Sequence, residues 1–134
     1  MKLFTSLRIR SFLLIFFSIC ATQVFAQAVG DYRSNSATMN WSQRNRWERW
    51  DGTAWTAPTM AQGTPTNASG VITIRNGHTV TVTASVIIDQ CTIDAGGQVT
   101  VNAGHILTVA NGAWTDLTVN GALVNSNNVT TTGT

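Results

Sequence analysis

Four tryptophans lie close together in the chain and are the side chains best suited to contact a ligand. They are Trp41, Trp47, Trp50 and Trp55, interleaved with Arg44, Arg46 and Arg49. Indole faces stack on sugar rings and guanidinium groups hydrogen-bond to hydroxyls, so this pattern predicts glycan contacts at the four tryptophans. The structural alternative starts from Asp51-Gly52, a two-residue turn signal between strands ending at Trp50 and starting at Thr53. Such a hairpin would cap the fold with its aromatics, and we expect this role first.

The two histidines and the cysteine offer little chemistry. His78 and His105 each follow a turn glycine but stand at different places in the repeat described below, so we expect two turn residues and no metal site. Cys91 lies on an apolar track, where an inert buried thiol is expected. The sequence predicts no catalytic residue, cofactor or metal.

Carboxylates are the remaining candidates, because sugar-cleaving enzymes use paired carboxyl groups. Beyond residue 70 the chain has Asp89, Asp94 and Asp116, with Arg75 as its one basic residue. Asp94 and Asp116 could approach across neighbouring repeats. No further signature accompanies them, so we expect a protein that is not an enzyme, with a polysaccharide lyase or hydrolase as the alternative.

The first residues resemble a secretory signal peptide. Basic residues between Lys2 and Arg10 come first, an apolar run follows at 12–21, and Ala26 supplies the small residue before cleavage. The apolar run is shorter than the roughly 20 residues that span a bilayer. The sequence predicts a signal peptide over 1–26, a secreted or cell-surface protein, and no membrane span after removal of this segment.

The charge balance changes once this segment is removed. The whole chain has 8 Lys+Arg and 6 Asp+Glu, for a net charge of +2. Lys2, Arg8 and Arg10 lie in the signal, which leaves 5 basic and 6 acidic residues from Gln27 onward. A nucleic-acid partner needs clustered positive charge, so we expect surface glycans or other surface proteins as partners instead. One remaining cysteine, Cys91, excludes a disulfide framework within this chain.

Two compositions meet near residue 70. Residues 27–69 are rich in Trp, Asn, Ser and Arg and predict a Trp-rich N-terminal cap or hairpin segment. Residues 70–134 are rich in Val, Ile, Thr, Gly and Asn, with the alternation and Gly/Asn turns typical of strands. We therefore expect an all-β protein.

The second segment repeats itself. Apolar-Thr-apolar triplets follow glycine-centred turns. The matched residues are Ile72 and Cys91, Val80 and Val99, and Ile88 and Leu107, each 19 residues apart, with Leu117 following Val99 after 18. One coil of a β-solenoid takes about 20 residues, so that residues one period apart stack.

This period favours a short right-handed parallel β-helix (a β-solenoid) with a Trp-rich N-terminal cap. An antiparallel β-sandwich is the alternative, because its short strands also recur regularly. The expected core consists of Ile72, Ile74, Val80, Val82, Ile88, Cys91, Ile93, Val99, Val101, Leu107, Val109, Leu117 and Val119. Glycines at 77, 97, 104, 112 and 121 mark the expected corners. Solenoid-like sequence continues almost to Thr134 without a visible cap, so we expect a fragment of a longer repeat.

Four segments carry a resemblance to known proteins. They are GDYRS at 30–34, NW at 40–41, WERWDGTAW at 47–55 and ITIRNGHTVTV at 72–82. In this order they are similar to the N-terminal region of secreted and outer-surface repeat proteins of gliding-type bacteria. The last is also similar to the start of the eight-glycine extracellular β-rich domain. The resemblance implies repeat architecture and type IX secretion, although the sorting domain of that route is not recognisable in these 134 residues.

The sequence as a whole predicts a non-catalytic structural or adhesive module of a secreted or cell-surface protein. The alternative is a carbohydrate-binding or polysaccharide-degrading protein whose active region lies beyond residue 134. The two hypotheses differ in what they require of the tryptophans, because glycan binding that depends on Trp50 or Trp55 is incompatible with a purely structural role.

Overall fold

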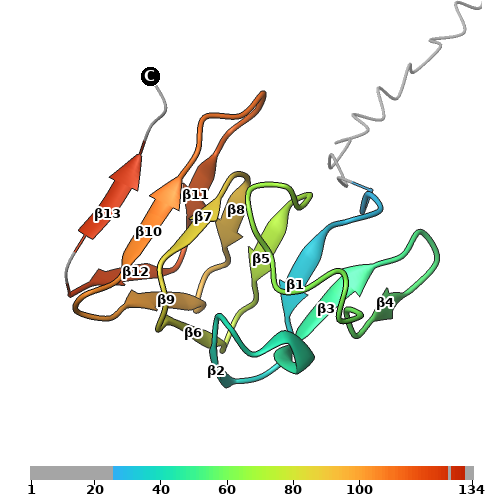
Figure 1. Ribbon diagram of the computed structural model, residues 1–134, viewed down its shortest axis with the longest axis horizontal. Coiled ribbons are helices and arrows are strands. Elements are labelled where there is room, and N and C mark those ends of the chain that lie inside the picture. The colour runs from blue at the N-terminus through green and yellow to red at the C-terminus, as the bar shows by residue number, and fades with distance from the viewer. Residues whose placement is uncertain (1–25, 127, 132–134) are drawn as a thin grey trace, which may run out of the picture.

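The computed structural model describes residues 26–126 and 128–131 and is nearly all β, with 41% strand and 3% helix (Figure 1). The all-β prediction is confirmed. The expected signal peptide lies outside the described residues, apart from Ala26. The elements are β1 (Tyr32–Ser34), β2 (Thr38–Asn40), the 3₁₀ helix η1 (Arg44–Arg46), β3 (Trp47–Trp50), β4 (Trp55–Thr56), β5 (Ile72–Ile74), β6 (Thr79–Val82), β7 (Val86–Ile88), β8 (Cys91–Ile93), β9 (Gln98–Val101), β10 (Ile106–Val109), β11 (Leu117–Val119), β12 (Ala122–Asn125) and β13 (Asn128–Thr131).

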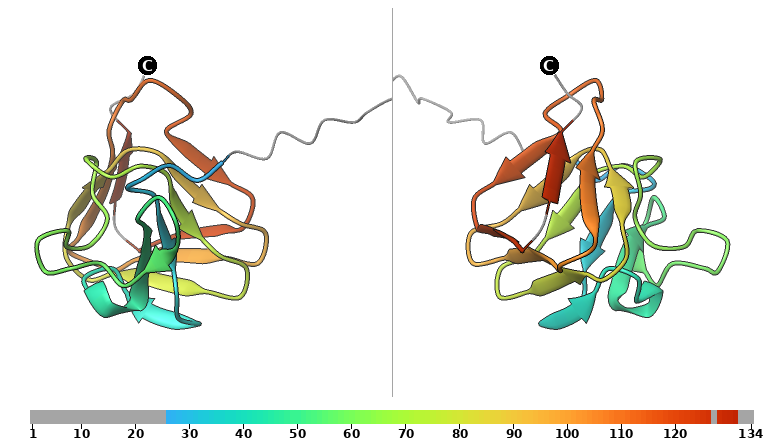
Figure 2. Two further views of the ribbon diagram at one scale, coloured as in Figure 1. Left: turned by 90° about the vertical axis from the view of Figure 1, so that its right-hand side faces the viewer. Right: turned by 60° about the vertical axis from the view of Figure 1, so that its left-hand side comes forward.

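Three sheets surround one interior, and from β5 onward each passage of the chain adds one strand to each sheet (Figure 2). We call each passage a coil: β5–β7, β8–β10 and β11–β13. Sheet A has the order β11-β8-β5-β1-β3-β4, sheet B the order β12-β9-β6-β2, and sheet C the order β13-β10-β7. Every pairing between coils is parallel. The antiparallel arrangement considered for this segment is therefore not the one the chain adopts.

The alternation of apolar and polar residues places one set of side chains inside. In β9, Val99 and Val101 are 1% and 0% exposed, whereas Gln98 and Thr100 point outward and are partly exposed. Successive side chains of a strand point to opposite faces, which explains the pattern. Of the expected core residues, all are buried except Leu117 and Val119, which lie in the last coil.

The 19-residue spacing holds between the first two coils in sheets A and B. Ile72 pairs with Cys91 and Val80 with Val99, as predicted. In sheet C, Ile88 pairs with Val109 and not with Leu107. The connection before β10 is longer than the one before β7, and this difference moves the register of that sheet.

The predicted position of the third coil is wrong. Leu117 pairs with Cys91 in sheet A, whereas Val99 pairs with Leu123 in sheet B. The cause is the loop between β10 and β11, residues 110–116, which replaces the short connection 89–90 between β7 and β8. A longer loop at one corner moves the later strands to higher residue numbers, but these strands still stack on the preceding coil.

The N-terminal segment closes one end of the three sheets. β1 pairs in parallel with β5, and β2 with β6, while β1–β3 and β3–β4 are antiparallel. The expected two-residue turn at Asp51-Gly52 is longer in the structure, because β4 begins at Trp55 and not at Thr53. The Asp51 carboxylate accepts hydrogen bonds from the backbone of Thr53 and Ala54, which stabilises this wider turn.

Candidate functional site

Two of the four candidate tryptophans are inside the protein. Trp41 and Trp47 are 3% and 1% exposed, and their ring centroids lie 5.0 Å apart in an edge-to-face contact. The Trp41 indole N–H donates to the Pro65 carbonyl at 2.9 Å, and that of Trp47 donates to the Trp41 carbonyl at 2.9 Å. Buried indoles need such partners. These two residues form the closed end of the core and have no free face for a sugar.

The other two lie together on the outer face of sheet A. Trp50 on β3 and Trp55 on β4 are cross-strand partners, and their ring centroids are 5.5 Å apart with a 58° tilt. Both are partly exposed. Trp47 and Trp50 are three residues apart on one strand and therefore point to opposite faces. The four tryptophans therefore form a buried pair, Trp41 and Trp47, and a surface pair, Trp50 and Trp55.

Arg33 connects the surface pair to the rest of the sheet. Its Nε donates to Glu48 Oε2 at 2.7 Å, and its guanidinium carbon lies 4.3 Å from the Trp55 ring centroid. The two charged side chains are 29% and 20% exposed, so both remain in contact with solvent. We call Arg33, Glu48, Trp50 and Trp55 the cap face. It combines aromatic surface with hydrogen-bonding groups, although Arg33 already covers one side of Trp55.

A row of threonines extends the cap face across the coils. Thr73, Thr92 and Thr118 are stacked in register on the outer side of sheet A, and Thr73 pairs with Arg33. Neighbouring strands are about 4.8 Å apart, so the hydroxyls form an evenly spaced line. The strip consists of the central Thr of the apolar-Thr-apolar triplets, which faces outward because its two apolar neighbours face inward.

The arginines grouped with the tryptophans in the sequence are separated in space. Arg44 donates to the Pro58 carbonyl, and Arg46 Nη1 donates to Ser36 Oγ at 3.3 Å. The Arg49 guanidinium carbon lies 6.0 Å from the Tyr32 ring centroid, beside a hollow of about 260 Å³. Arg33 is the basic residue whose guanidinium group lies over a surface tryptophan, Trp55.

Ser34 and His78 are arranged like a nucleophile and its general base, but the serine hydroxyl is not accessible to a substrate. Ser34 Oγ lies 2.8 Å from His78 Nδ1 and also accepts the backbone N–H of Arg75 at 3.0 Å. The serine is completely buried, so no substrate reaches its hydroxyl. Burial, and then the positive charge of Arg75, lower the pKa of His78. The pair ties the cap to the first coil. His105 immediately precedes β10 at the corner between sheets B and C, whereas His78 immediately precedes β6 at the corner between sheets A and B.

The register brings Asp89, and not Asp94, next to Asp116. Asp116 immediately precedes β11 and Asp89 lies two residues before β8, so both occupy one corner, while Asp94 follows β8 at the next corner. Asp116 Oδ1 accepts the Gly112 N–H at 3.0 Å, and Asp89 Oδ1 is buried with no hydrogen-bond partner among the described residues. Burial first, and then the Asp116 carboxylate, raise the pKa of Asp89.

This arrangement predicts a pH-dependent gain of stability for Asp89→Asn. A raised pKa means that the charged form opposes folding, and this penalty grows as the pH rises from about 4 through the pKa of the folded state. At pH 7 the free energy of unfolding of the variant should exceed that of the original protein by about 0.5 kcal/mol, which is the size of effect typical of partly exposed charge pairs. Thermal unfolding at pH 7 and near pH 3 measures the difference, which should vanish at the lower pH. Asp94→Asn is the matched control, and an equal gain there would contradict the argument.

Cys91 lies in the interior between Ile72 and Leu117 and is 2% exposed. Burial raises the pKa of its thiol to about 12, so the thiolate is scarce at neutral pH. Nucleophilic cysteines have lowered pKa values and accessible sites. Cys91 therefore contributes packing to the core.

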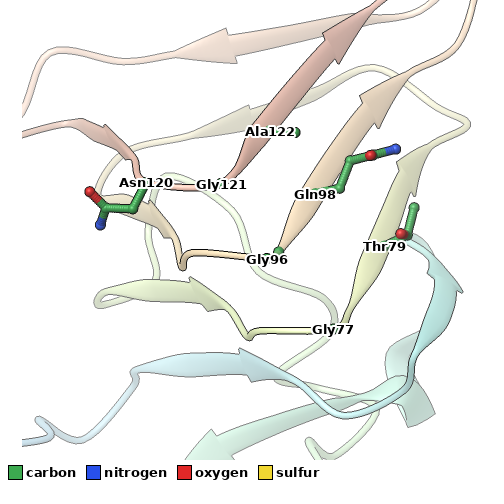
Figure 3. A pocket seen from close by; sticks show the side chains of 8 residues that line it. Gly77, Thr79, Gly96, Gln98, Asn120, Gly121 and Ala122 are labelled. Carbon is green, nitrogen blue, oxygen red and sulfur yellow. The ribbon is translucent and has the colours of Figure 1, made fainter.

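A hollow of about 450 Å³ lies at the corner between sheets A and B (Figure 3). Backbone from all three coils forms it through Gly77, Gly96, Gly97 and Gly121, and the uncharged side chains of Thr79, Gln98, Asn120 and Ala122 complete it. The Gln98 amide donates to Thr100 Oγ1 at 2.9 Å and is thereby held against its own strand. The hollow follows from the glycine corners predicted in the sequence, and its lining holds no charged or titratable side chain.

Within residues 26–126 and 128–131, no three His, Cys, Asp or Glu side chains gather as a metal site would require. In the same residues, no helix has the length and hydropathy to cross a membrane. Comparison of the chain with protein-family models, with curated proteins and with solved structures finds no match.

Proposed function

We propose that the chain is a non-catalytic structural or adhesive module of a secreted or cell-surface protein, built as a short parallel β-solenoid with a Trp-rich cap. The observation that carries this proposal is the in-register parallel stacking of the coils. Ile72, Cys91 and Leu117 follow one another through sheet A, and Val80, Val99 and Leu123 through sheet B. Such stacking makes a stiff rod with regular outer faces, which suits a spacer or contact surface.

The side chains that could act as nucleophiles are enclosed by other residues of the fold, which supports a non-catalytic role. The Ser34 hydroxyl is enclosed between His78 and the Arg75 backbone, and the Cys91 thiol is enclosed in the core. The outer faces are rich in threonine and poor in charge, as expected for a surface that meets solvent or other surfaces. In residues 1–26, a basic stretch is followed by an apolar run and then by small residues, which is the order found in secretory signal peptides and supports export.

Glycan binding at the cap face is the second candidate, favoured by the partly exposed Trp50–Trp55 pair beside the Arg33–Glu48 ion pair. The purified protein, expressed from its full sequence, should be tested on a glycan array together with Trp55→Ala. Removal of an aromatic stacking partner weakens sugar binding by about tenfold or more, because such a contact contributes about 1.5 kcal/mol.

Trp114→Ala is the matched control, since Trp114 is 79% exposed and lies on the loop between β10 and β11. The structural proposal predicts no glycan signal for any of the three proteins. Binding that is lost in Trp55→Ala and kept in Trp114→Ala would replace the purely structural role with glycan recognition at the cap face.

A further inference from the structure

The Arg49 side chain borders a hollow that is separate from the cap face. Along β3, Trp47 and Arg49 point to one face of sheet A, whereas Glu48 and Trp50 point to the other, because successive side chains alternate. Arg49 lines the hollow of about 260 Å³, and Glu48 and Trp50 do not. We call this space the Arg49 hollow. The other lining residues used below are Gly30, Tyr32, Gln62, Thr66, Ser69 and Gly70.

The walls of the Arg49 hollow are held together by hydrogen bonds between distant parts of the chain. The Gly70 N–H donates to the Gly30 carbonyl at 3.0 Å. The Tyr32 hydroxyl donates to the Gln62 carbonyl at 3.0 Å. The loop 62–70 is therefore fixed against β1, and the hollow exists without a ligand. A site that is formed in advance loses less conformational entropy when it binds.

Arg49 brings a positive charge to this hollow and has no negative partner. It is partly exposed, and its guanidinium carbon lies 6.0 Å from the Tyr32 ring centroid. Burial raises the pKa of Tyr32, and the nearby Arg49 charge acts against this rise. Within residues 26–126 and 128–131, the ion pair that forms joins Arg33 to Glu48, and none includes Arg49.

Asp31 lies next to Gly30 in the chain but does not neutralise this charge. Its carboxylate accepts the N–H of Ala28 at 2.8 Å and the N–H of Val71 at 2.9 Å. The residue is 8% exposed and is not part of the lining of the hollow. A guanidinium without a carboxylate beside it attracts an anion, and its planar fork matches the two oxygens of a carboxylate.

The neutral side chains of the lining add hydrogen-bond donors. The Ser69 hydroxyl accepts the Thr66 N–H at 3.0 Å, and the Thr66 hydroxyl accepts the Ala68 N–H at 3.3 Å. A hydroxyl that accepts one N–H still has its own hydrogen to donate. The side-chain oxygen of Gln62 accepts the Thr59 N–H at 2.8 Å, which leaves its amide hydrogens for donation. The lining thus combines a positive charge with several neutral donors.

We propose that the Arg49 hollow binds an acidic sugar residue, with the sugar carboxylate on the Arg49 guanidinium. The hydroxyl and amide groups of the lining meet the hydroxyls of the sugar ring. Pockets for drug-sized ligands hold about 300–1,000 Å³, so a hollow of about 260 Å³ suits a single sugar residue. An amino acid fits less well, because its ammonium group finds no carboxylate in the lining.

The two parts of this assignment have different support. The choice of an anion rests on the charge and the donors of the lining. The choice of a saccharide rests on the proposed role at a cell surface, where acidic polysaccharides are the abundant carboxylates. The experiment therefore compares an acidic sugar with a neutral sugar and with a simple carboxylate.

NMR titration of the purified, ¹⁵N-labelled protein, expressed from its full sequence, with sodium glucuronate tests the site. The backbone amide signals of Gly30, Ser69 and Gly70 should shift and approach saturation. Glucose at the same concentration, and sodium chloride at the same ionic strength, should leave them in place. Sodium acetate should bind about tenfold more weakly than glucuronate, because it lacks the ring hydroxyls that hydrogen-bond to the lining.

Arg49→Gln should weaken glucuronate binding by about tenfold or more, because it removes the charge and the two parallel N–H donors. Arg46→Gln is the matched control, since Arg46 is exposed, donates to Ser36 Oγ and does not line the hollow. It should bind like the original protein. Arg49→Lys keeps the charge without the fork and should fall between the two. The amide spectrum of each variant also shows directly that the variant is folded.

Four results would overturn the proposal. They are equal shifts with glucose and glucuronate, equal affinity for acetate and glucuronate, equal weakening by Arg49→Gln and Arg46→Gln, or no shift with glucuronate at about 50 mM, where a site with a Kd near 1 mM is almost saturated. Shifts at the indole N–H signals of Trp50 and Trp55 in place of the hollow would also overturn it and would support the cap face instead. A negative result at the hollow leaves the structural proposal standing, because the stacking of the coils does not depend on Arg49.

Discussion

Replacement of Trp47 by alanine should destabilise the protein by about 4 kcal/mol, the largest effect we expect from one side-chain truncation. The side chain is 1% exposed, contacts the rings of both Tyr32 and Trp41, and donates its N–H to the Trp41 carbonyl. Truncation leaves a cavity at the closed end of the core together with an unpaired carbonyl. Urea unfolding, followed by circular dichroism, measures the change in the free energy of unfolding.

Two further variants make this result interpretable. Trp47→Phe keeps an aromatic ring and loses the N–H, so it should fall between the original protein and the alanine variant. Trp114→Ala removes the same atoms from a side chain that is 79% exposed and should change the free energy of unfolding by less than about 0.5 kcal/mol. Similar losses in Trp47→Ala and Trp114→Ala would show that the buried pair does not hold the cap together.

The second large effect is expected at Gly121, where the third coil lies directly against the backbone of the second. A Cβ atom there would lie 2.2 Å from the Gly97 carbonyl oxygen and 2.4 Å from that of Asp94. Both contacts are with backbone, which cannot rotate away as a side chain can. Gly121→Ala should therefore push the third coil off the second and destabilise the protein by about 3 kcal/mol.

Hydrogen exchange locates this effect. The amides of Ala122 and Ser126, which donate to Gly97 and Val101, should lose protection, while the amides that join β6 to β9 keep theirs. Gly77→Ala is the matched control at the same corner of the first coil. Beyond its two chain neighbours, no described atom lies within 4 Å of its Cβ position, but its φ of +76° is unfavourable for alanine by about 1–2 kcal/mol. A larger loss in Gly77→Ala than in Gly121→Ala would contradict the steric explanation.

The inward residues were predictable because their pattern is local. Val99 and Val101 flank an outward threonine, and a period of two is sufficient to assign both to the core. The corner glycines could be placed for the same reason. The position of the third coil was not predictable, since it depends on the length of one loop. Residues 110–116 include Ala110, Ala113 and Trp114, whose apolar character does not distinguish a loop from a strand.

The sequence predicted which residue types form the candidate site but not which of those residues lie on the surface. All four tryptophans look equivalent in the sequence, yet Trp47 is buried and Trp50 is on the surface. If both residues are known to lie in β3, their three-residue spacing requires that they point to opposite faces of the sheet. The sequence, however, predicted only that a strand ends at Trp50 and did not predict where that strand begins. Neither the partnership of Arg33 with Trp55 nor that of Asp89 with Asp116 could be found this way, because both depend on which strands become neighbours.

The parallel stacking of the coils on a closed cap gives the molecule a direction of assembly. The edges of β1 and β2 are completed by β5 and β6, and each later strand finds its partner in the coil before it. A chain that emerges from the ribosome amino end first therefore presents the template strands before the segments that pair with them, so that folding can advance with synthesis. Unfolding should run the other way, beginning at β13 and reaching the tryptophan cap last.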